Sequence, residues 1–185
     1  MPDAIIIGDG PGGLSAALFL AKVGKSVVVI GQNKTAMHWA MLYNYLGIEK
    51  MHGSEFQTIA KKQVTGHGAT IREERVEKVE KSAAGFAVTT EGGETLEATY
   101  LVLSEGKGPR LAKELGLKEG DDGAIPVDRN GLSAIPNVYV VGRSVRPGRS
   151  QAIISAGDGA AAALDILSRE KGEAFVDWDS PPKDE

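Results

Sequence analysis

The sequence contains no cysteine, and this absence restricts its chemistry more than any other feature of its 185 residues. Without a thiol the chain has no disulfide, no thiolate metal site and no redox dithiol. Any electron transfer must therefore rely on a bound cofactor. The three histidines also lack the spacing of a metal site, so we expect no metal.

Long hydrophobic runs and a strong charge of either sign are missing as well. No apolar stretch reaches the roughly eighteen residues that cross a membrane, and the N-terminus lacks the basic start of a secretion signal. The net charge of −4 argues against a nucleic-acid partner, which would favour a basic face. We therefore expect a cytoplasmic protein with neither a membrane nor a nucleic-acid partner.

Glycine, by contrast, is abundant, and its most informative occurrence is the segment GDGPGG at residues 8–13. This segment lies between an apolar run at 4–7 and a small-residue run at 14–20. The pattern predicts a buried strand, a glycine turn and a helix. A second apolar run at 25–30 closes a βαβ unit within about thirty residues, as a dinucleotide-binding unit requires.

Each residue of the glycine turn has a predicted role in such a unit. Gly8 permits the tight turn, Gly10 lets the backbone approach a pyrophosphate, and Gly13 lets the helix pack closely on the sheet. Pro11 suits an early helical position because it needs no amide partner there. The phosphate would bind the free amides at the positive end of the helix. The alternative is an ordinary glycine-rich turn in an α/β domain.

The rest of the chain predicts one α/β domain with a Rossmann-like fold, in which a parallel central sheet is joined by an antiparallel β-meander. The predicted elements are a helix at 55–64 with a capping box of Ser54 and Gln57, a strand at 69–71, a meander of 75–81, 86–90 and 95–98, a buried strand at 100–103, a short helix at 109–115, a turn-rich hairpin at 121–130, a buried strand at 138–141 and a helix to 171 capped by Ser150. We expect the domain to span residues 1–172, followed by a polar C-terminal tail at 173–185 that is loose from residue 177 onward.

Four separated parts of the chain carry a family resemblance. They are GDGPGG at 8–13, LYNYLG at 42–47, LSEG at 103–106, and PNVYVVG at 136–142 followed by SQAIISAG at 150–157. Together they resemble the flavin-binding domain of the thioredoxin reductase family over nearly the whole chain. The resemblance implies FAD as the cofactor. The amides of Gln151 and Ala152 would then face the edge of the flavin that becomes negative on reduction.

The motifs and the resemblance together predict a set of cofactor-binding residues, although they identify no catalytic residue. The predicted contacts with FAD are Gly8, Gly10, Pro11, Gly12, Gly13, Gln32, Asn44, Val76, Ser104, Gly106, Gly142, Arg143, Gln151 and Ala152.

The sequence also departs from the family pattern. The family inserts a second nucleotide domain with a dithiol, whereas about thirty residues separate Gly106 from Val138, too few for such a domain. The second strand ends at Gln32 without the acidic residue that usually holds a ribose hydroxyl, and Gln32 or Asn33 would serve as a neutral partner in its place. Arg143 stands where the family has aspartate, and it would bind a phosphate or pair with Asp9. The chain is therefore not expected to be a conventional thioredoxin reductase.

Two functions remain open on this evidence. In the first, the chain is a minimal FAD-binding oxidoreductase that receives electrons from a free reduced nicotinamide or a redox partner protein. In the second, it is a nucleotide- or partner-binding module without turnover, with a homodimer formed through residues 37–47 and the final helix. The small residues at 156–163 allow either the approach of a flat ring or tight helix packing.

Two further groups of side chains have alternative interpretations. Arg143, Arg146 and Arg149 either neutralise an anionic ligand or belong to an exposed loop. His38 and Trp39 are open to a catalytic role beside the flavin. We favour instead a packed strand or an interface in which residues 37, 39, 41 and 43 alternate.

Overall fold

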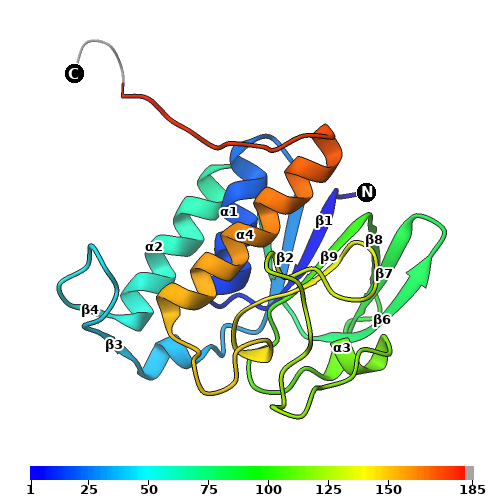
Figure 1. The fold of residues 1–185 in the computed structure, drawn as a ribbon, viewed down its shortest axis with the longest axis horizontal. Coiled ribbons are helices and arrows are strands. Elements are labelled where there is room, and N and C mark those ends of the chain that lie inside the picture. Colours follow the sequence, from blue (N-terminus) through cyan, green and yellow to red (C-terminus); the bar gives the residue numbers. More distant parts are fainter. Residues whose placement is uncertain (182–185) are drawn as a thin grey trace.

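The computed structural model describes residues 1–181 and has a parallel five-stranded sheet at its centre (Figure 1). Its strand order is β10-β9-β1-β2-β5, with bounds Val138–Val140, Tyr100–Leu103, Ala4–Ile7, Val27–Gly31 and Thr70–Glu73. Ile7 is in register with both Ile30 and Leu103, and Leu103 with Val140. The carboxyl ends of four neighbouring strands therefore lie level at one edge of the sheet.

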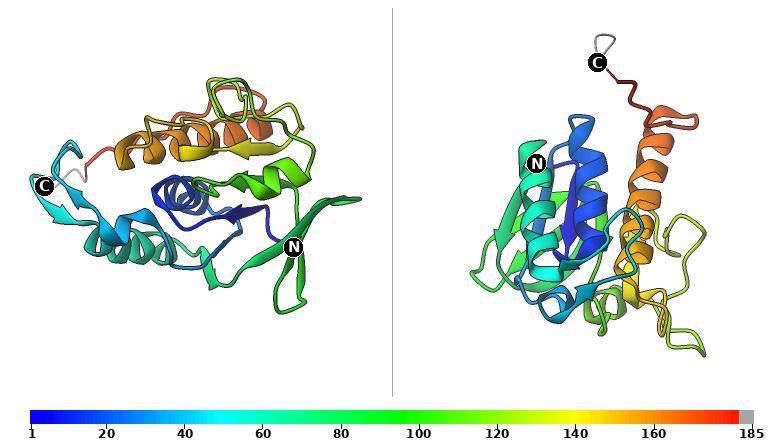
Figure 2. Two further views of the ribbon diagram at one scale, coloured as in Figure 1. Left: turned by 90° about the horizontal axis from the view of Figure 1, so that it is seen from below. Right: turned by 90° about the vertical axis from the view of Figure 1, so that its left-hand side faces the viewer.

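Long helices cover one face of this sheet. Figure 2 shows α1 between α2 and α4, and their bounds are Pro11–Lys22, Gly53–Gly66 and Ala152–Lys171. Because parallel strands are buried on both faces, they are apolar throughout and do not alternate. Ile6 and Val102 pack toward the helices, while Ile5 and Leu101 pack toward the opposite face.

An antiparallel meander covers that opposite face, as the sequence predicts. Its strands are β6 Val76–Ser82, β7 Gly85–Thr90 and β8 Thr95–Ala98, and the short helix α3, Arg110–Glu114, lies beside it. Val79, Phe86 and Val88 are buried against the sheet. The predicted fold class is therefore confirmed.

Helices α1 and α4 cross at glycines. A Cβ atom on Gly159 would lie 2.0 Å from the backbone oxygen of Gly12, so only glycine fits at that point of α4. Ala162 and Ala163 are buried in the same interface. The small-residue face of α4 is thus used for packing against α1 at these positions.

Three local predictions are wrong. The N-cap of α2 is His52, which accepts a hydrogen bond from the amide of Ser54, whereas the sequence predicts Ser54 as the cap. The N-cap of α4 is Gln151, which makes no side-chain cap, rather than Ser150. Residues 121–130 form no strand hairpin, because Asp122 and Asp128 bind nearby backbone amides instead.

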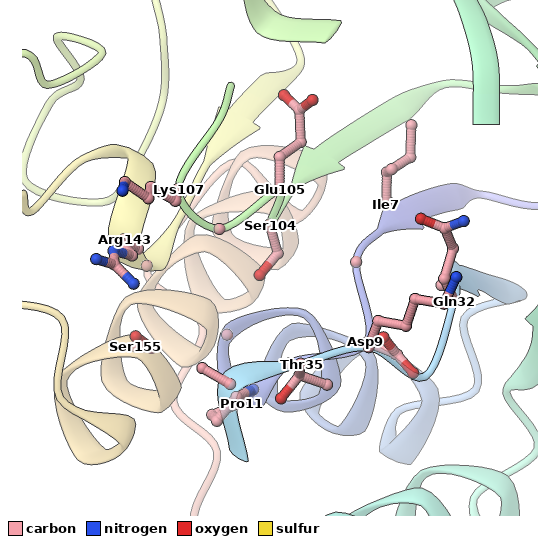
Figure 3. Close-up of a pocket in the computed structure, with 18 of the residues that line it drawn as sticks. Ile7, Asp9, Pro11, Gln32, Thr35, Ser104, Glu105, Lys107, Arg143 and Ser155 are labelled. Atoms are coloured by element: carbon pink, nitrogen blue, oxygen red, sulfur yellow. The ribbon is translucent and has the colours of Figure 1, made fainter. Parts of the chain in front are cut away.

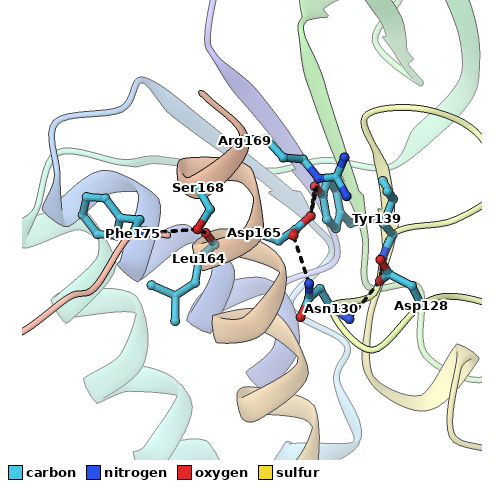
Figure 4. Close-up of polar contacts among 9 residues, drawn as sticks. Asp128, Asn130, Tyr139, Leu164, Asp165, Ser168, Arg169 and Phe175 are labelled. Carbon is cyan, nitrogen blue, oxygen red and sulfur yellow. Dashed lines mark hydrogen bonds and ion pairs between the residues drawn. The ribbon is translucent and has the colours of Figure 1, made fainter. Parts of the chain in front are cut away.

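A polar cluster fixes the C-terminal half of α4 to the sheet (Figure 4). Asp165 accepts hydrogen bonds from Tyr139 at 2.6 Å, from Asn130 at 2.9 Å and from Arg169. Burial alone would raise the pKa of Asp165, but these hydrogen bonds and the Arg169 charge together lower it. Burial and the carboxylate of Asp165 both raise the pKa of Tyr139, so its hydroxyl stays protonated.

The first part of the predicted tail contacts the helices. Phe175 packs against the core, and its amide donates a hydrogen bond to Ser168. Asp177 forms an ion pair with Lys22 of α1 at 2.8 Å. The prediction of a loose tail from residue 177 is therefore wrong for Asp177, while residues 182–185 of the predicted tail lie outside the described residues. The division of the chain at residue 172 stays a prediction.

Candidate functional site

A cleft of about 580 Å³ opens at the carboxyl edge of the central sheet. It is bordered by the loops that follow β1, β2, β9 and β10 and by the first residues of α1 and α4 (Figure 3). In doubly wound α/β folds this edge is where ligands bind, because the loops there diverge and leave a crevice.

The turn from β1 into α1 is closed by glycines that no other residue could replace. Gly8 has a φ of +108°, and a Cβ atom on it would lie 2.1 Å from the backbone oxygen of Ser104. A Cβ atom on Gly13 would lie 1.9 Å from the backbone oxygen of Gly8. Gly13 therefore lies beneath the cleft and allows the close turn.

Gly10 has the opposite environment. A Cβ atom on it would meet no atom within 4 Å, and the residue lines the cleft. Its backbone borders open space at the start of α1, where a bulky ligand group can approach. The predicted roles of Gly8, Gly10 and Gly13 thus match three different geometries.

Both helix starts present free amides to this cleft. Within residues 1–181, the amides of Gly12 and Gly13 in α1 and of Ala152 and Ile153 in α4 make no hydrogen bond. Gly12 and Ala152 line the same cleft. Helix starts attract anions because their free N–H groups and the helix dipole both favour negative charge. The two helix starts therefore border one and the same cleft.

Most of the predicted binding residues border the cleft. Those that line it are Gly8, Gly10, Pro11, Gly12, Gln32, Val76, Ser104, Gly106, Gly142, Arg143 and Ala152. Asn44 and Gln151 lie beside it, where the Asn44 side chain donates a hydrogen bond to Gln151 at 3.0 Å. That contact connects the 42–47 segment to the start of α4. Whether each residue contacts the cofactor stays a prediction.

The predicted pairing of Asp9 with Arg143 is wrong. Asp9 forms an ion pair with Lys61 of α2 at 3.0 Å, while Arg143 forms none within residues 1–181. Arg146 is also withdrawn from the predicted cationic cluster, because it pairs with Asp158 at 2.8 Å. Of the three arginines, Arg143 is the one that lines the cleft.

The packed-strand interpretation of residues 37–43 is also wrong. Met37 is buried in a short 3-10 helix, η1 (Ala36–Trp39), but Trp39 and Tyr43 are 78% and 66% exposed. His38 makes its hydrogen bond to Asn33 at 3.1 Å, beside the loop that follows β2. The interface interpretation of the segment stays a prediction.

Several cleft residues escape the sequence reasoning. They are Lys34, Thr35, Glu105, Lys107, Arg110 and Ser155, among others. Ser155 comes one turn after Gln151 in α4, so its helical spacing from a predicted site residue was a usable signal. Lys107 follows the predicted Gly106, but a lysine in a loop has no pattern of its own.

Glu105 illustrates a cleft residue with a structural partner. Its carboxylate accepts hydrogen bonds from the amides of Leu111 at 2.8 Å and Ala112 at 3.0 Å at the start of α3. Burial raises the pKa of Glu105, and these amides oppose that shift. The side chain is therefore occupied in holding the segment that follows β9.

The cleft fits an elongated dinucleotide. Two sets of free amides border it, Gly10 leaves open space, and Lys34, Lys107 and Arg143 line it without an ion pair inside residues 1–181.

In the described part of the chain, the acidic and histidine side chains form no group able to hold a metal ion. Across that same part, we find no helix with the length and hydrophobicity of a membrane span.

Comparison with known proteins places this geometry in a family. Residues 46–159 match a family model described as pyridine nucleotide-disulphide oxidoreductase, and residues 3–41 match one described as FAD binding domain. A dihydrolipoyl dehydrogenase of Geobacillus stearothermophilus is 28% identical over 181 residues, covering 88% of this chain and 38% of the relative. A thioredoxin reductase of Helicobacter pylori is 30% identical over 125 residues, covering 64% and 39%.

Solved structures show the same fold. A thioredoxin reductase from Gloeobacter violaceus aligns with a TM-score of 0.84 at 18% identity, covering 96% of this chain and 99% of that chain. The atypical thioredoxin reductase TRi from Desulfovibrio vulgaris Hildenborough aligns with the same TM-score at 18% identity, covering 94% and 99%. The chain spans less than two fifths of the length of its curated relatives. It belongs to the pyridine nucleotide-disulphide oxidoreductase family and is an FAD-binding domain with the fold of the thioredoxin reductases.

Proposed function

We propose that this chain acts as a single-domain flavoprotein oxidoreductase that holds FAD in the cleft and takes electrons from an external donor. One observation carries the proposal: the open starts of α1 and α4 border the same cleft. Bound FAD would supply two-electron redox chemistry, and the protein would supply binding, orientation and charge.

In this proposal the starts of α1 and α4 have different roles in binding FAD. The amides of Gly12 and Gly13 would bind the pyrophosphate, since the open space at Gly10 lets it approach. The start of α4 would stabilise negative charge on a nearby ring, because its amides and dipole point there. Lys107 and Arg143 add positive charge on the same side (Figure 3).

The chain segment between β9 and β10 is the reason for proposing an external electron donor. That stretch holds α3 and irregular turns and folds against the meander face of the sheet. The sequence also has no cysteine to pass electrons to a disulfide substrate. Electrons would therefore enter and leave through the open side of the cleft, from a reduced nicotinamide or a partner protein.

A partner-binding role without turnover is the second candidate, and exposed apolar side chains favour it. Trp39, Tyr43 and Leu46 are 78%, 66% and 89% exposed, and Trp39 also lines the cleft. Large exposed apolar side chains grouped on one segment often mark a contact surface. A homodimer through this segment is one form of that proposal, and sedimentation of the Leu46→Asp variant against the unchanged chain measures it.

A visible-absorption experiment separates the two candidates. The purified chain is incubated with FAD, desalted and scanned, and reduced nicotinamide is then added without air. Retained flavin absorbance that bleaches supports the oxidoreductase. Retained absorbance that neither reduced nicotinamide nor dithionite-reduced ferredoxin bleaches supports the binding module. A colourless chain that binds no added FAD contradicts both the site and the proposed reaction.

A further inference from the structure

The carboxylate of Asp9 lies at the end of β2, although Asp9 belongs to the glycine turn after β1. A Cβ atom on Gly31, the last residue of β2, would lie 2.6 Å from Oδ1 of Asp9. Gly31 therefore has no side chain where the Asp9 carboxylate packs. The acidic group that the sequence lacks after its second strand is supplied in space by the turn that follows the first.

Contacts from two other elements hold Asp9 in this position. Its Oδ2 accepts hydrogen bonds from the amide of Asn33 at 3.1 Å and pairs with Lys61 at 3.0 Å. The buried side chain of Gln57 donates to the backbone oxygen of Asp9 at 2.7 Å. The carboxylate is therefore fixed by α2 and by the loop after β2, and it is not free to rotate into solvent.

One oxygen of this carboxylate keeps its capacity to accept a hydrogen bond, although the side chain is only 7% exposed. Oδ1 makes no hydrogen bond to any residue between 1 and 181, and Asp9 lines the cleft. Figure 3 shows Asp9 beside Gln32, on the side of the cleft away from Lys107 and Arg143. An ionised carboxylate only accepts hydrogen bonds, so its complement is a hydroxyl or amine donor.

We propose that Asp9 is the residue that binds the ribose of an adenine nucleotide in this cleft, with Oδ1 accepting a hydrogen bond from a ribose hydroxyl. The proposal rests on the proposed function for its ligand. A carboxylate at the end of the second strand holds the ribose in dinucleotide-binding units because it lies one strand away from the phosphate site. Asp9 reaches the same place from the glycine turn, and Gly31 makes room for it.

The alternative is that Asp9 only braces the turn against α2 through Lys61. The two roles differ in what they say about ligand chemistry. A brace would change stability and the affinity for every nucleotide equally. A ribose contact distinguishes nucleotides that have a given hydroxyl from those that lack it.

The test is equilibrium dialysis of the chain with ADP, 2′-deoxy-ADP and 3′-deoxy-ADP. The unchanged protein should bind ADP about ten-fold more tightly than at least one deoxy analogue, the usual size of a hydrogen bond to a charged acceptor. Asp9→Ala should reduce that preference to about two-fold or less. Lys61→Met is the matched control: it removes the brace but keeps the carboxylate, so the preference should remain.

The outcomes separate this inference from the proposed function. Equal binding of all three nucleotides by the unchanged protein overturns the role of Asp9, whether or not Asp9→Ala folds, and leaves FAD binding untouched. Loss of the preference in Lys61→Met as well as in Asp9→Ala also overturns it. A ribose preference in a chain that binds no FAD supports Asp9 and contradicts the proposed reaction. Failure to bind either ADP or FAD overturns both.

Discussion

Helices α1 and α4 both open onto the cleft, but they are held in place in different ways. The start of α1 is fixed mainly by its own turn, where a Cβ atom on Gly13 would meet the backbone oxygen of Gly8. The start of α4 follows an exposed loop, and the Asn44 side chain donates a hydrogen bond to Gln151 there. Farther along, α4 is anchored by Gly159 and Asp165. A local motif thus positions one half of the site, and tertiary packing positions the other.

The largest expected effect is at the turn before α1. Gly13→Ala should destabilise the protein by about 3 kcal/mol, because the added methyl group meets a backbone carbonyl that cannot move aside. Urea unfolding measures this change. Gly66→Ala is the control, since a Cβ atom there meets nothing within 4 Å, and it should change stability by less than about 1 kcal/mol. Equal stability of the two variants would contradict a tight turn.

The anchor of α4 should be the next most sensitive position. Asp165→Asn should cost about 2 kcal/mol at neutral pH, because it weakens hydrogen bonds to a side chain that is 12% exposed. The pKa of Asp165 is lowered in the folded state, so its contribution is present above the unfolded pKa and is lost as pH falls through the folded one.

Urea unfolding across a pH series tests that sign. The stability difference between Asp165→Asn and the unchanged chain should shrink as the pH falls below about 4. The exposed Asp121→Asn should show no such difference at any pH. A difference for Asp165→Asn that grows in acid would mean that the carboxylate does not stabilise the fold.

A substitution on the side of the α1 turn that faces the cleft should weaken FAD binding and leave the stability of the fold unchanged. Gly10→Ala adds a methyl group to open space, so its unfolding should match that of the unchanged chain within about 1 kcal/mol. Its affinity for FAD should fall about ten-fold or more, equal to about 1.4 kcal/mol. Fluorescence titration of flavin measures the affinity, and unaltered binding would place the pyrophosphate elsewhere.

Arg143 tests the contribution of charge near α4. Arg143→Ala should weaken FAD binding about three-fold at low salt, and the difference should disappear near 1 M salt, where charges are screened within about 3 Å. Lys118→Ala, an exposed residue outside the cleft, should leave the affinity unchanged. An affinity for the Arg143→Ala variant that equals the control at low salt would exclude a phosphate contact.

The smallest expected effect is at the contact that positions the start of α4. Asn44→Leu removes one exposed hydrogen bond and should cost about 0.5 kcal/mol or less in urea unfolding. Gln151→Leu should cost the same, and the double variant no more than either single one, because both lose the same contact. Additive losses would show that Asn44 and Gln151 act independently.

The contrast between the local turn that positions α1 and the tertiary packing that positions α4 explains which elements the sequence predicts. The strand, turn and helix at residues 4–22 follow from adjacent residues, so their order and the roles of Gly8 and Gly13 were readable. The N-caps of α2 and α4 were not, because a cap depends on the angle at which the preceding loop arrives. His52 caps α2, and Ser54, the better capping residue, lies inside the helix.

The environment of Asp9 lay outside sequence reasoning for a related reason. Its partners Lys61 and Gln57 come from α2, about fifty positions later in the chain, and no spacing rule connects them. Opposite charge was the reason to predict Arg143 as the partner of Asp9, but the fold places Arg143 elsewhere along the cleft. The hairpin predicted at 121–130 failed because aspartates in turns bind their own backbone, and such local bonds compete with strand pairing.

The two backbone groups of Gly12 have different surroundings. Its amide opens toward the ligand site, and its carbonyl lies where a side chain on Gly159 would be. No flexible group separates the two backbones, so a small shift of one helix is passed directly to the other. The two helices whose starts border the cleft are therefore held together by direct backbone contact, with no side chain between them at this crossing.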